Sequence, residues 1–411
     1  MKYLKNLLGW VDERFPLIET WEFHLSKYYA PKNFNFWYFF GSLALLVLVI
    51  QIVSGIFLTM SYKPDALIAF ASVEYIMRDV QSGWLIRYIH STGASMFFIV
   101  VYLHMFRGMI YGSYRKPREL LWIIGVVIYL ALMAEAFMGY LLPWGQMSFW
   151  GAQVIVNLFS SVPFVGNELS VLIRGDFVIS DATLNRFFAL HVIAIPLLLA
   201  GIVFVHLVAL HKVGSNNPDG IEIKKKKDAN GIPLDGIPFF PYMVVKDIVA
   251  VVLFLIVFCV IVFFAPDMGG YFIEANNFVP ANPMQTPAHI APVWYFTPYY
   301  AILRAVPPLF GSQFPGVIAM GVAAVAVLFL PWLDRGPVKS IRYRGMLYKG
   351  FLASFVISFI GLGYLGLMPA TPTYTVISQV LSVVYFAFFI LMPWYTKIDK
   401  CKPEPDRLTF K

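Results

Sequence analysis

The chain has 411 residues, of which 59% are hydrophobic, 17% aromatic and only 13% charged, and its mean hydropathy is +0.71. Soluble domains are nearer half apolar and a quarter charged, so this composition excludes an ordinary soluble protein and indicates a surface that faces lipid. The formal net charge of +8 would suit a nucleic-acid-binding protein, but the distribution of the basic residues, given below, argues against that class.

Eight apolar segments are long enough to cross a bilayer, for which a helix needs about 20 residues. In chain order they are 37–60, 86–110, 120–141, 185–210, 245–265, 316–333, 350–367 and 373–394. We therefore predict an all-α integral membrane protein with eight transmembrane helices, the first four of which form a four-helix bundle.

Lysine and arginine are divided unequally between the segments that flank these helices. The N-terminus, the connections after the second, fourth and sixth helices and the C-terminus carry 23 of them, and the alternate connections carry 4. Because basic residues stay on the cytoplasmic side, both termini are predicted to be cytoplasmic. The run from Lys224 to Lys227 is then part of an ordinary inner loop, and no nucleic-acid partner is expected.

Two connections on the opposite, outer side are long and rich in proline, glycine and aromatic residues: 142–184 and 266–315. Loops of this length are often functional. We expect two regions in the chain. Residues 1–215 hold a surface helix and the four-helix bundle, and residues 216–411 hold the remaining four helices with the second long outer loop.

Four histidines lie inside the apolar segments. His90 and His104 are fourteen residues apart on the second helix, which is about 21 Å along the axis and two heptads, so both face one seam of a bundle. His191 and His206 are fifteen apart on the fourth helix. The extra residue rotates one of them by roughly 100° unless a local π-turn absorbs it.

Antiparallel packing of these two helices predicts two pairs, His90 with His191 on the outer side and His104 with His206 on the inner side. Histidine in lipid is costly and usually functional. Two imidazoles fill both axial positions of a haem iron, which suits electron transfer. Any one of these histidines could instead be a core residue bonded to its neighbours, but four in matched register favour metal ligands. The chain has no CxxCH motif, so the haems would be bound non-covalently.

Paired glycines support this interpretation. Gly41 and Gly55 on the first helix, and Gly125 and Gly139 on the third, repeat the fourteen-residue spacing. Glycine allows the close approach of a planar group, although small residues also serve helix–helix packing. Two arginines, Arg87 and Arg107, each lie three residues from a histidine and could bind haem propionates or extend toward the membrane surface.

Several local sequences resemble cytochrome b of the quinol:cytochrome c oxidoreductase (cytochrome bc) complex, and the resemblance covers nearly the whole chain. They are Arg87 to His90 (RYIH), Gly139 to Gly151 (GYLLPWGQMSFWG), Gly214 to Pro218 (GSNNP), Pro292 to Tyr295 (PVWY) and Tyr300 to Arg304 (YAILR). Eight helices in one chain are similar to the respiratory form. The fifteen-residue histidine spacing is similar to photosynthetic and some bacterial members rather than mitochondrial ones.

The resemblance implies a membrane subunit that oxidises quinol at an outer site and reduces quinone at an inner site, with proton translocation. It implies two bis-histidine haems b, ubiquinone and ubiquinol, a Rieske-type iron–sulfur protein, a cytochrome c-type subunit and a homodimeric complex surrounded by lipid in a bacterial plasma membrane. The alternatives are a dihaem membrane anchor of another dehydrogenase or reductase, which would not need the long outer loops, and a transporter, which would bind no haem.

The resemblance also implies site residues. The family's outer site is built from the 142–160 and 290–300 regions, to which we assign Tyr140, Tyr295 and Tyr300. The inner site near the first, fourth and fifth helices receives His211, Ser215, Lys246 and Asp247. The last two begin the fifth helix, where a charged pair can supply protons to a reduced quinone or simply mark a helix start.

One outer-site position departs from the family. Where the family's motif usually has a glutamate that is thought to accept a proton from quinol, this chain has Val293. Glu135 lies inside the third predicted helix, one turn before Gly139, and is the replacement that we favour because carboxylates inside a membrane are usually functional. The alternative is that Glu135 makes a structural hydrogen bond and that Glu274 or solvent takes the proton.

Overall fold

The computed structural model describes residues 2–410 and is almost wholly helical. Within this range eight helices are long and apolar enough to cross a membrane, and their ends differ from the predicted ones by at most six residues. They are Phe36–Thr59, Gly83–Tyr111, Glu119–Leu141, Asp181–Val213, Phe239–Phe264, Phe314–Leu333, Met346–Leu367 and Pro372–Ile390. Lipid offers no partner for backbone N–H and C=O groups, so apolar runs of this length fold as helices. The predicted all-α membrane fold is confirmed.

Four spans consist of one helix and four of several consecutive ones. The first four are η2 (Phe36–Phe39) with α3 (Phe40–Thr59), α5 (Gly83–Tyr111), α6 (Glu119–Leu141) and a continuous run of α9 (Asp181–Ala189), η3 (Leu190–Ala194) and α10 (Ile195–Val213). The others are η5 (Phe239–Met243) with α11 (Val244–Phe264), α13 (Phe314–Val325) with η8 (Ala326–Phe329) and α14 (Leu330–Leu333), α15 (Met346–Leu367) and α16 (Pro372–Ile390).

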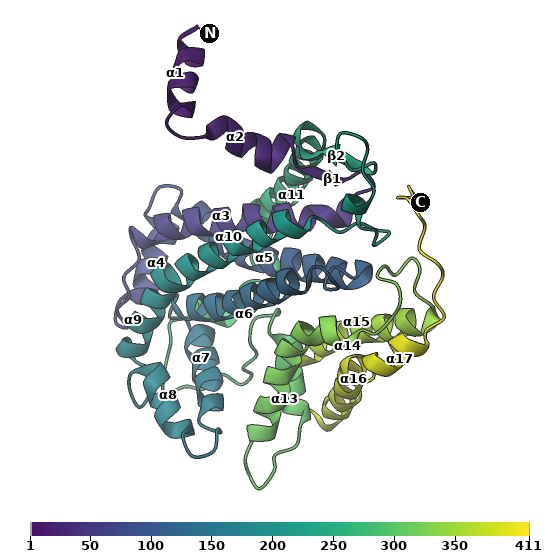
Figure 1. The fold of residues 1–411 in the computed structure, drawn as a ribbon. Helices are drawn as coiled ribbons and strands as arrows, with labels where there is room; N and C mark the ends of the chain where they lie inside the picture. Colours follow the sequence, from purple (N-terminus) through teal and green to yellow (C-terminus); the bar gives the residue numbers. More distant parts are fainter. Residues whose placement is uncertain (1, 411) are drawn as a thin grey trace.

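Shorter elements precede, connect or follow the spans. The helices are α1 (Lys2–Asp12), α2 (Leu17–Trp21), α4 (Ala69–Arg78), α7 (Gln146–Phe159), α8 (Gly166–Arg174), α12 (Thr297–Ala305) and α17 (Met392–Ile398). Two short strands, β1 (Tyr29–Pro31) and β2 (Gly236–Pro238), pair antiparallel and tie the N-terminal segment to the start of the fifth span. Figure 1 shows α1 and α2 projecting away from the body of the molecule.

The first four spans lie together and form one half of the molecule, and the last three lie in the other half (Figure 1). In the first half α3 packs against α5 and α6 packs against α10, while α11 contacts α3 and α5. In the second half α12 packs against α13, α15 and α16. The four-helix arrangement therefore places the helices that carry the four histidines beside the helices that carry the paired glycines.

The two long outer loops are joined to each other. The amide of Gln146 donates to the carbonyl of Val279 at 2.9 Å, and the amide of Ala281 donates to the carbonyl of Trp144 at 3.0 Å. The side chain of Asn277 accepts from both the amide and the hydroxyl of Ser148, at 2.9 and 3.0 Å. These bonds hold the loop that follows α11 against the start of α7, next to the end of α6.

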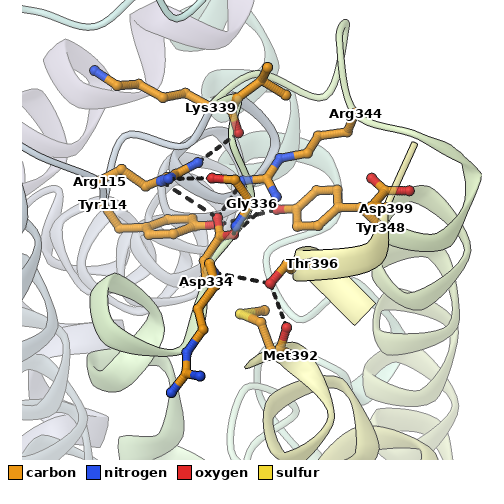
Figure 2. Close-up of polar contacts among 12 residues, drawn as sticks. Tyr114, Arg115, Asp334, Gly336, Lys339, Arg344, Tyr348, Met392, Thr396 and Asp399 are labelled. Carbon is orange, nitrogen blue, oxygen red and sulfur yellow. Dashed lines mark hydrogen bonds and ion pairs between the residues drawn. The ribbon is translucent and has the colours of Figure 1, made fainter. Parts of the chain in front are cut away.

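A buried polar cluster joins the connection after α5 to the connection between α14 and α15 (Figure 2). We call it the Asp334 cluster, and its members are Tyr114, Arg115, Asp334, Arg344 and Tyr348. Asp334 and Arg344 form an ion pair in which both side chains are 0% exposed, and Asp334 also accepts from the Tyr114 hydroxyl at 2.7 Å. The neighbouring cations hold the pKa of Asp334 below its usual value.

Candidate functional site

The outer histidine pair joins α5 to the fourth span. The ring centroids of His90 and His191 are 6.2 Å apart and the rings are nearly perpendicular, at 86°. The Nδ1 atom of His90 lies 2.9 Å from the Ser54 hydroxyl, which donates its own proton to the Ile50 carbonyl. The Nδ1 of His191 lies 2.9 Å from the backbone oxygen of Glu135 and 3.0 Å from its carboxylate. With both Nδ1 atoms engaged, Nε2 is the nitrogen left for a metal.

The fifteen-residue spacing on the fourth span is accommodated by a π-turn. Leu190–Ala194 forms a π-helical segment between α9 and α10, and His191 lies within it. A π-turn inserts one extra residue into a helix without ending it. It therefore compensates for the rotation that the extra residue between His191 and His206 would otherwise cause, and both imidazoles can face the bundle interior.

The inner pair lies between α5 and α10. His104 and His206 are close enough to interact electrostatically, and Arg107 extends its guanidinium to within 3.4 Å of the Nδ1 of His104. Arg107 also lies over the Tyr38 ring, 4.9 Å from its centroid. Among the described residues, the buried Nε of Arg107 has no hydrogen-bond partner.

Each of the four paired glycines lies against one imidazole. A Cβ atom added to Gly41, Gly55 or Gly125 would lie 3.2 Å from the nearest imidazole carbon, and one added to Gly139 would lie closer still. The pairs are Gly41 with His104, Gly55 with His90, Gly125 with His206 and Gly139 with His191. The glycines thus leave room for the histidine rings, and only a residue without a side chain fits opposite His191 without displacing the ring.

A largely apolar cavity of about 450 Å³ extends from the outer histidine pair to the outer loops. Arg87, Tyr140, Val293 and Tyr295 line it together with the two histidines. Tyr295 stacks on Phe98 with centroids 3.9 Å apart. Tyr300 is not among the lining residues; its ring lies under the Arg304 guanidinium, 4.7 Å from the centroid.

Two carboxylates lie near this cavity and have different partners. Glu135 lines the cavity and directs one carboxylate oxygen to His191. Glu274 accepts a hydrogen bond from the Tyr140 hydroxyl at 2.7 Å. Burial raises the pKa of Glu274 to about 7. The role predicted for Glu135 as proton acceptor stays a prediction.

At the inner end, His211 and Ser215 meet the N-terminal segment. Tyr28 lies 4.8 Å from the His211 ring, centroid to centroid, and its hydroxyl is 3.0 Å from the Ser215 hydroxyl. His24 packs edge-on against His211 at 4.8 Å. These three rings lie at a groove of about 710 Å³. His24 and Tyr28 were not predicted, because nothing in the spacing of the sequence connects residues that are almost 190 positions apart.

The other two residues assigned to the inner site lie on α11. Lys246 is exposed and Asp247 is half-buried, with a side-chain hydrogen bond to Ser42 on α3. Neither lines the groove beside His211. The assignment of all four residues to one quinone site remains a prediction.

Comparison with known proteins places the chain in a family. Residues 25–214 match the family model described as cytochrome b/b6/petB, and residues 280–386 match the model for the C-terminal part, cytochrome b(C-terminal)/b6/petD. A cytochrome b of Allochromatium vinosum is 68% identical over 406 residues, which is 98% of each chain. The chain belongs to the cytochrome b family. A cytochrome b of Rhodospirillum rubrum is 52% identical and covers 98% of this chain and 96% of its own length.

A solved structure agrees with this assignment. A chain of a hyperthermophilic respiratory Complex III superimposes with a TM-score of 0.88 at 40% identity, and covers 95% of this cytochrome b and 99% of its own length. The predicted resemblance to cytochrome b of the cytochrome bc complex is confirmed, and with it the assignment to the membrane subunit of a multisubunit quinol:cytochrome c oxidoreductase.

The residues of this cytochrome b fit the haem that the family implies. Two imidazoles with engaged Nδ1 atoms face each other across an apolar cavity, and Arg87 lines the same cavity. At the inner level, the buried Nε of Arg107 has no partner within residues 2–410. A buried guanidinium nitrogen normally has a partner, so its position fits a site for a bound group with carboxylates.

Proposed function

We propose that this cytochrome b oxidises quinol at the outer loops, passes electrons across the membrane through two bis-histidine haems b and reduces quinone at the inner end, with proton translocation. The observation that carries the proposal is the cavity itself. It connects the outer histidine pair to Tyr140, Val293 and Tyr295, so that a substrate bound by the outer loops would lie beside the first redox centre. A dihaem anchor for another enzyme would not need this connection.

Four histidines would hold the two haems. His90 and His191 would ligate an outer haem b and His104 and His206 an inner one, through their Nε2 atoms. When bound, the haems supply one-electron transfer between the two sides. The hydrogen bonds at the Nδ1 atoms of His90 and His191 orient the rings and raise their strength as ligands. Arg87 and Arg107 supply cations for the propionates, and the glycines opposite each imidazole keep the rings in place.

The outer loops would bind the quinol. The apolar lining excludes water and holds the ring system, and Tyr140 offers a hydroxyl for a hydrogen bond. Tyr295 is buried, and its position on Phe98 limits its movement. The substrate is a membrane quinol, which the family assigns to ubiquinol. Tyr300 would support the loop rather than contact the quinol, because it lies outside the cavity lining.

The inner groove would bind the quinone to be reduced. His211 and the Tyr28–Ser215 pair offer hydrogen-bonding groups at one end of the bundle, below the inner histidine pair. Nδ1 of His211 donates to the Leu207 carbonyl at 2.9 Å, which leaves Nε2 to bind a carbonyl oxygen. Lys246 and Asp247 would supply protons from the aqueous edge.

We place the protein in a bacterial plasma membrane, where the basic connections and both termini would be cytoplasmic. The outer loops would then face a Rieske-type iron–sulfur protein that takes one electron of each quinol, and a cytochrome c-type subunit would take it next. A homodimeric complex surrounded by lipid is the assembly that the family implies.

Redox spectroscopy tests the proposal. In the purified complex, dithionite reduction should give b-type absorption bands that titrate in two steps at separate potentials. Quinol should reduce these bands through the outer site when the inner site is blocked by an inhibitor. Absence of a b-type band would refute the proposal, and a single titrating centre would refute the two-haem part of it.

A further inference from the structure

The outer site of this chain lacks the carboxylate that the family's motif supplies, but another carboxylate of the same outer loop, Glu274, is connected to the cavity through Tyr140. Glu274 follows α11 in the sequence, and Tyr140 lies in the last turn of α6. The Tyr140 hydroxyl donates to Oε2 of Glu274 at 2.7 Å, and Tyr140 lines the cavity that contains Val293 and Tyr295. The hydroxyl is thus a link between the cavity and a carboxylate that is 134 residues away in the chain.

We propose that Glu274, acting through the Tyr140 hydroxyl, takes the first proton released by quinol at the outer site and replaces the carboxylate absent at Val293. This inference rests on the proposed function, since it needs quinol at the outer loops. Tyr140 is the residue that touches the quinol, and Glu274 is the proton acceptor behind it.

The backbone around Glu274 is held in place by bonds that have nothing to do with proton transfer. The Glu274 carbonyl accepts from the amide of Asn277 at 2.9 Å. Asn277 in turn accepts two hydrogen bonds from Ser148 at the start of α7, and the amide of Asn282 donates to the Gln146 side chain at 2.7 Å. Because the segment that follows Glu274 is anchored to the start of α7, the Glu274 carboxylate is positioned on Tyr140 before any substrate binds.

The surroundings of Glu274 suit a group that takes and releases protons near neutral pH. Within the described chain, the titratable groups that face it are Tyr140 and Tyr295, and no cation contributes to its electrostatics. Burial disfavours the charged carboxylate and raises its pKa to about 7. The residue is half-buried and is followed by exposed Ala275 and Asn276, so a proton on Glu274 has a short way to the outer aqueous phase.

Glu135 is the rival acceptor and is placed differently. Its carboxylate lies 3.0 Å from the Nδ1 of His191, and the Glu135 backbone oxygen lies 2.9 Å from the same atom. Acceptors at this second ring nitrogen orient an imidazole and make it a stronger ligand. A quinol proton moved onto the Glu135 carboxylate would disturb the contact that holds His191. The hydrogen bonds of Glu274 within the described residues go to Tyr140 and Asn277, and none of them goes to one of the four histidines.

The proton transfer balances without a further reactant. The quinol O–H bond breaks as its proton moves to the Tyr140 oxygen. The Tyr140 O–H bond breaks at the same time as that proton moves to Oε2 of Glu274. The products are a quinol anion, neutral Tyr140 and protonated Glu274, and no electron has moved. Rotation of the protonated carboxyl toward solvent returns the proton to the outer side.

Kinetics of the intact complex test this with four variants. Glu274→Gln keeps the hydrogen bond from Tyr140 but removes the proton acceptor. Quinol-driven reduction of cytochrome b through the outer site should therefore slow by about 100-fold, the typical contribution of a positioned general base.

Glu168→Gln is the matched control, because Glu168 is an exposed carboxylate on α8 in the other outer loop, and it should keep the native rate. Val293→Glu added to Glu274→Gln should recover most of the loss, since it returns a carboxylate to the cavity. Glu135→Gln tests the rival.

The pH profile and infrared spectroscopy give readouts that a structural role would not change. The rate of cytochrome b reduction in the native complex should rise as pH increases through about 7, because the carboxylate must be ionised to accept a proton. In Glu274→Gln this rise with pH should be absent. A protonated-carboxyl band that titrates near pH 7 should also disappear in Glu274→Gln.

The outcomes separate this inference from the proposed function. If the native complex is not reduced by quinol at all, the proposed function fails. If the native complex is active and Glu274→Gln keeps both the native rate and the rise of that rate with pH, the inference is overturned. If only Glu135→Gln slows the reaction and abolishes its rise with pH, the proton goes to Glu135. The inference is then overturned in favour of the acceptor that the sequence predicted.

Discussion

The histidine sites and the Asp334 cluster both bury charged groups, but they differ in how completely their carboxylates are bonded. In the Asp334 cluster (Figure 2), both carboxylate oxygens of Asp334 accept hydrogen bonds, from Arg344, Tyr114 and the amide of Gly336. Along the line of the four histidines, which we call the histidine seam, one carboxylate oxygen of Glu135 and the Nε of Arg107 have no partner among the residues described, whereas in the Asp334 cluster only the Nε of Arg344 has none. A carboxylate bonded through both oxygens holds two connections together, whereas a buried carboxylate with an unbonded oxygen marks a place where a proton or a bound group can be accommodated.

The largest expected effect comes from removing a histidine of the seam. His191→Leu should remove the outer haem and abolish quinol-driven turnover, because an iron held by two imidazoles loses one of its two protein ligands. The reduced-minus-oxidised spectrum should keep only the inner centre.

His289→Asn is a suitable control. Its ring bonds the Leu367 carbonyl at 2.9 Å, outside the bundle, so both b-type bands should remain. Retention of two titrating centres in His191→Leu would contradict the ligand assignment.

Breaking the Asp334 cluster should affect stability and not redox chemistry. Asp334→Ala leaves Arg344 buried without its partner, and loss of one member of a buried ion pair costs about 3–5 kcal/mol of unfolding free energy. The measurement is thermal or denaturant unfolding of the detergent-solubilised protein, with haem content per folded molecule recorded alongside.

The double variant Asp334→Ala with Arg344→Met removes both charges and should recover part of the loss. A shift in haem potential without a loss of stability would show that the cluster belongs to the redox machinery, and the contrast between the two regions would fail.

Glycine substitutions should produce a graded effect along the seam. Gly139→Ala should disturb haem binding more than Gly125→Ala, because the added methyl group lies closer to His191 than the corresponding group lies to His206. Gly201→Ala is the matched control, since nothing lies within 4 Å of its added Cβ.

Haem content and midpoint potentials measure this series. An equal effect of Gly139→Ala and Gly201→Ala would show that the glycines serve general helix packing and not the imidazoles.

The smallest effect should come from the C-terminal tail, which is bonded to the connection between α10 and β2. Arg407 and Lys32 hold the pKa of Asp235 well below its usual value. A carboxylate with a depressed pKa stabilises the folded state at neutral pH, and this contribution is lost only as the pH falls below the usual range through the depressed pKa.

Arg407→Ala should therefore loosen the tail at neutral pH, while the native tail stays attached at pH 5. Limited proteolysis of residues 400–410 at both pH values measures this. Unchanged cleavage in Arg407→Ala would show that other contacts hold the tail.

Sequence patterns predicted the features that depend on local order and missed those that depend on distant contacts. The spans follow from uninterrupted apolar runs, and the depth of the histidines follows from their spacing and the rise of a helix. The contact of Tyr140 with Glu274 and the meeting of Tyr28 with His211 join residues that are far apart in the chain. No periodicity connects such residues, because irregular loops carry no repeat.

By itself, the sequence determined a membrane bundle with two levels of histidine, because hydropathy and helical spacing are local properties of the chain. The tertiary structure alone decided that a π-turn absorbs the extra residue at His191, and that each glycine lies against an imidazole. It also decided that Glu135 reaches a histidine while Glu274 reaches Tyr140. Those outcomes depend on how separate helices and loops approach one another, which only the packed structure determines.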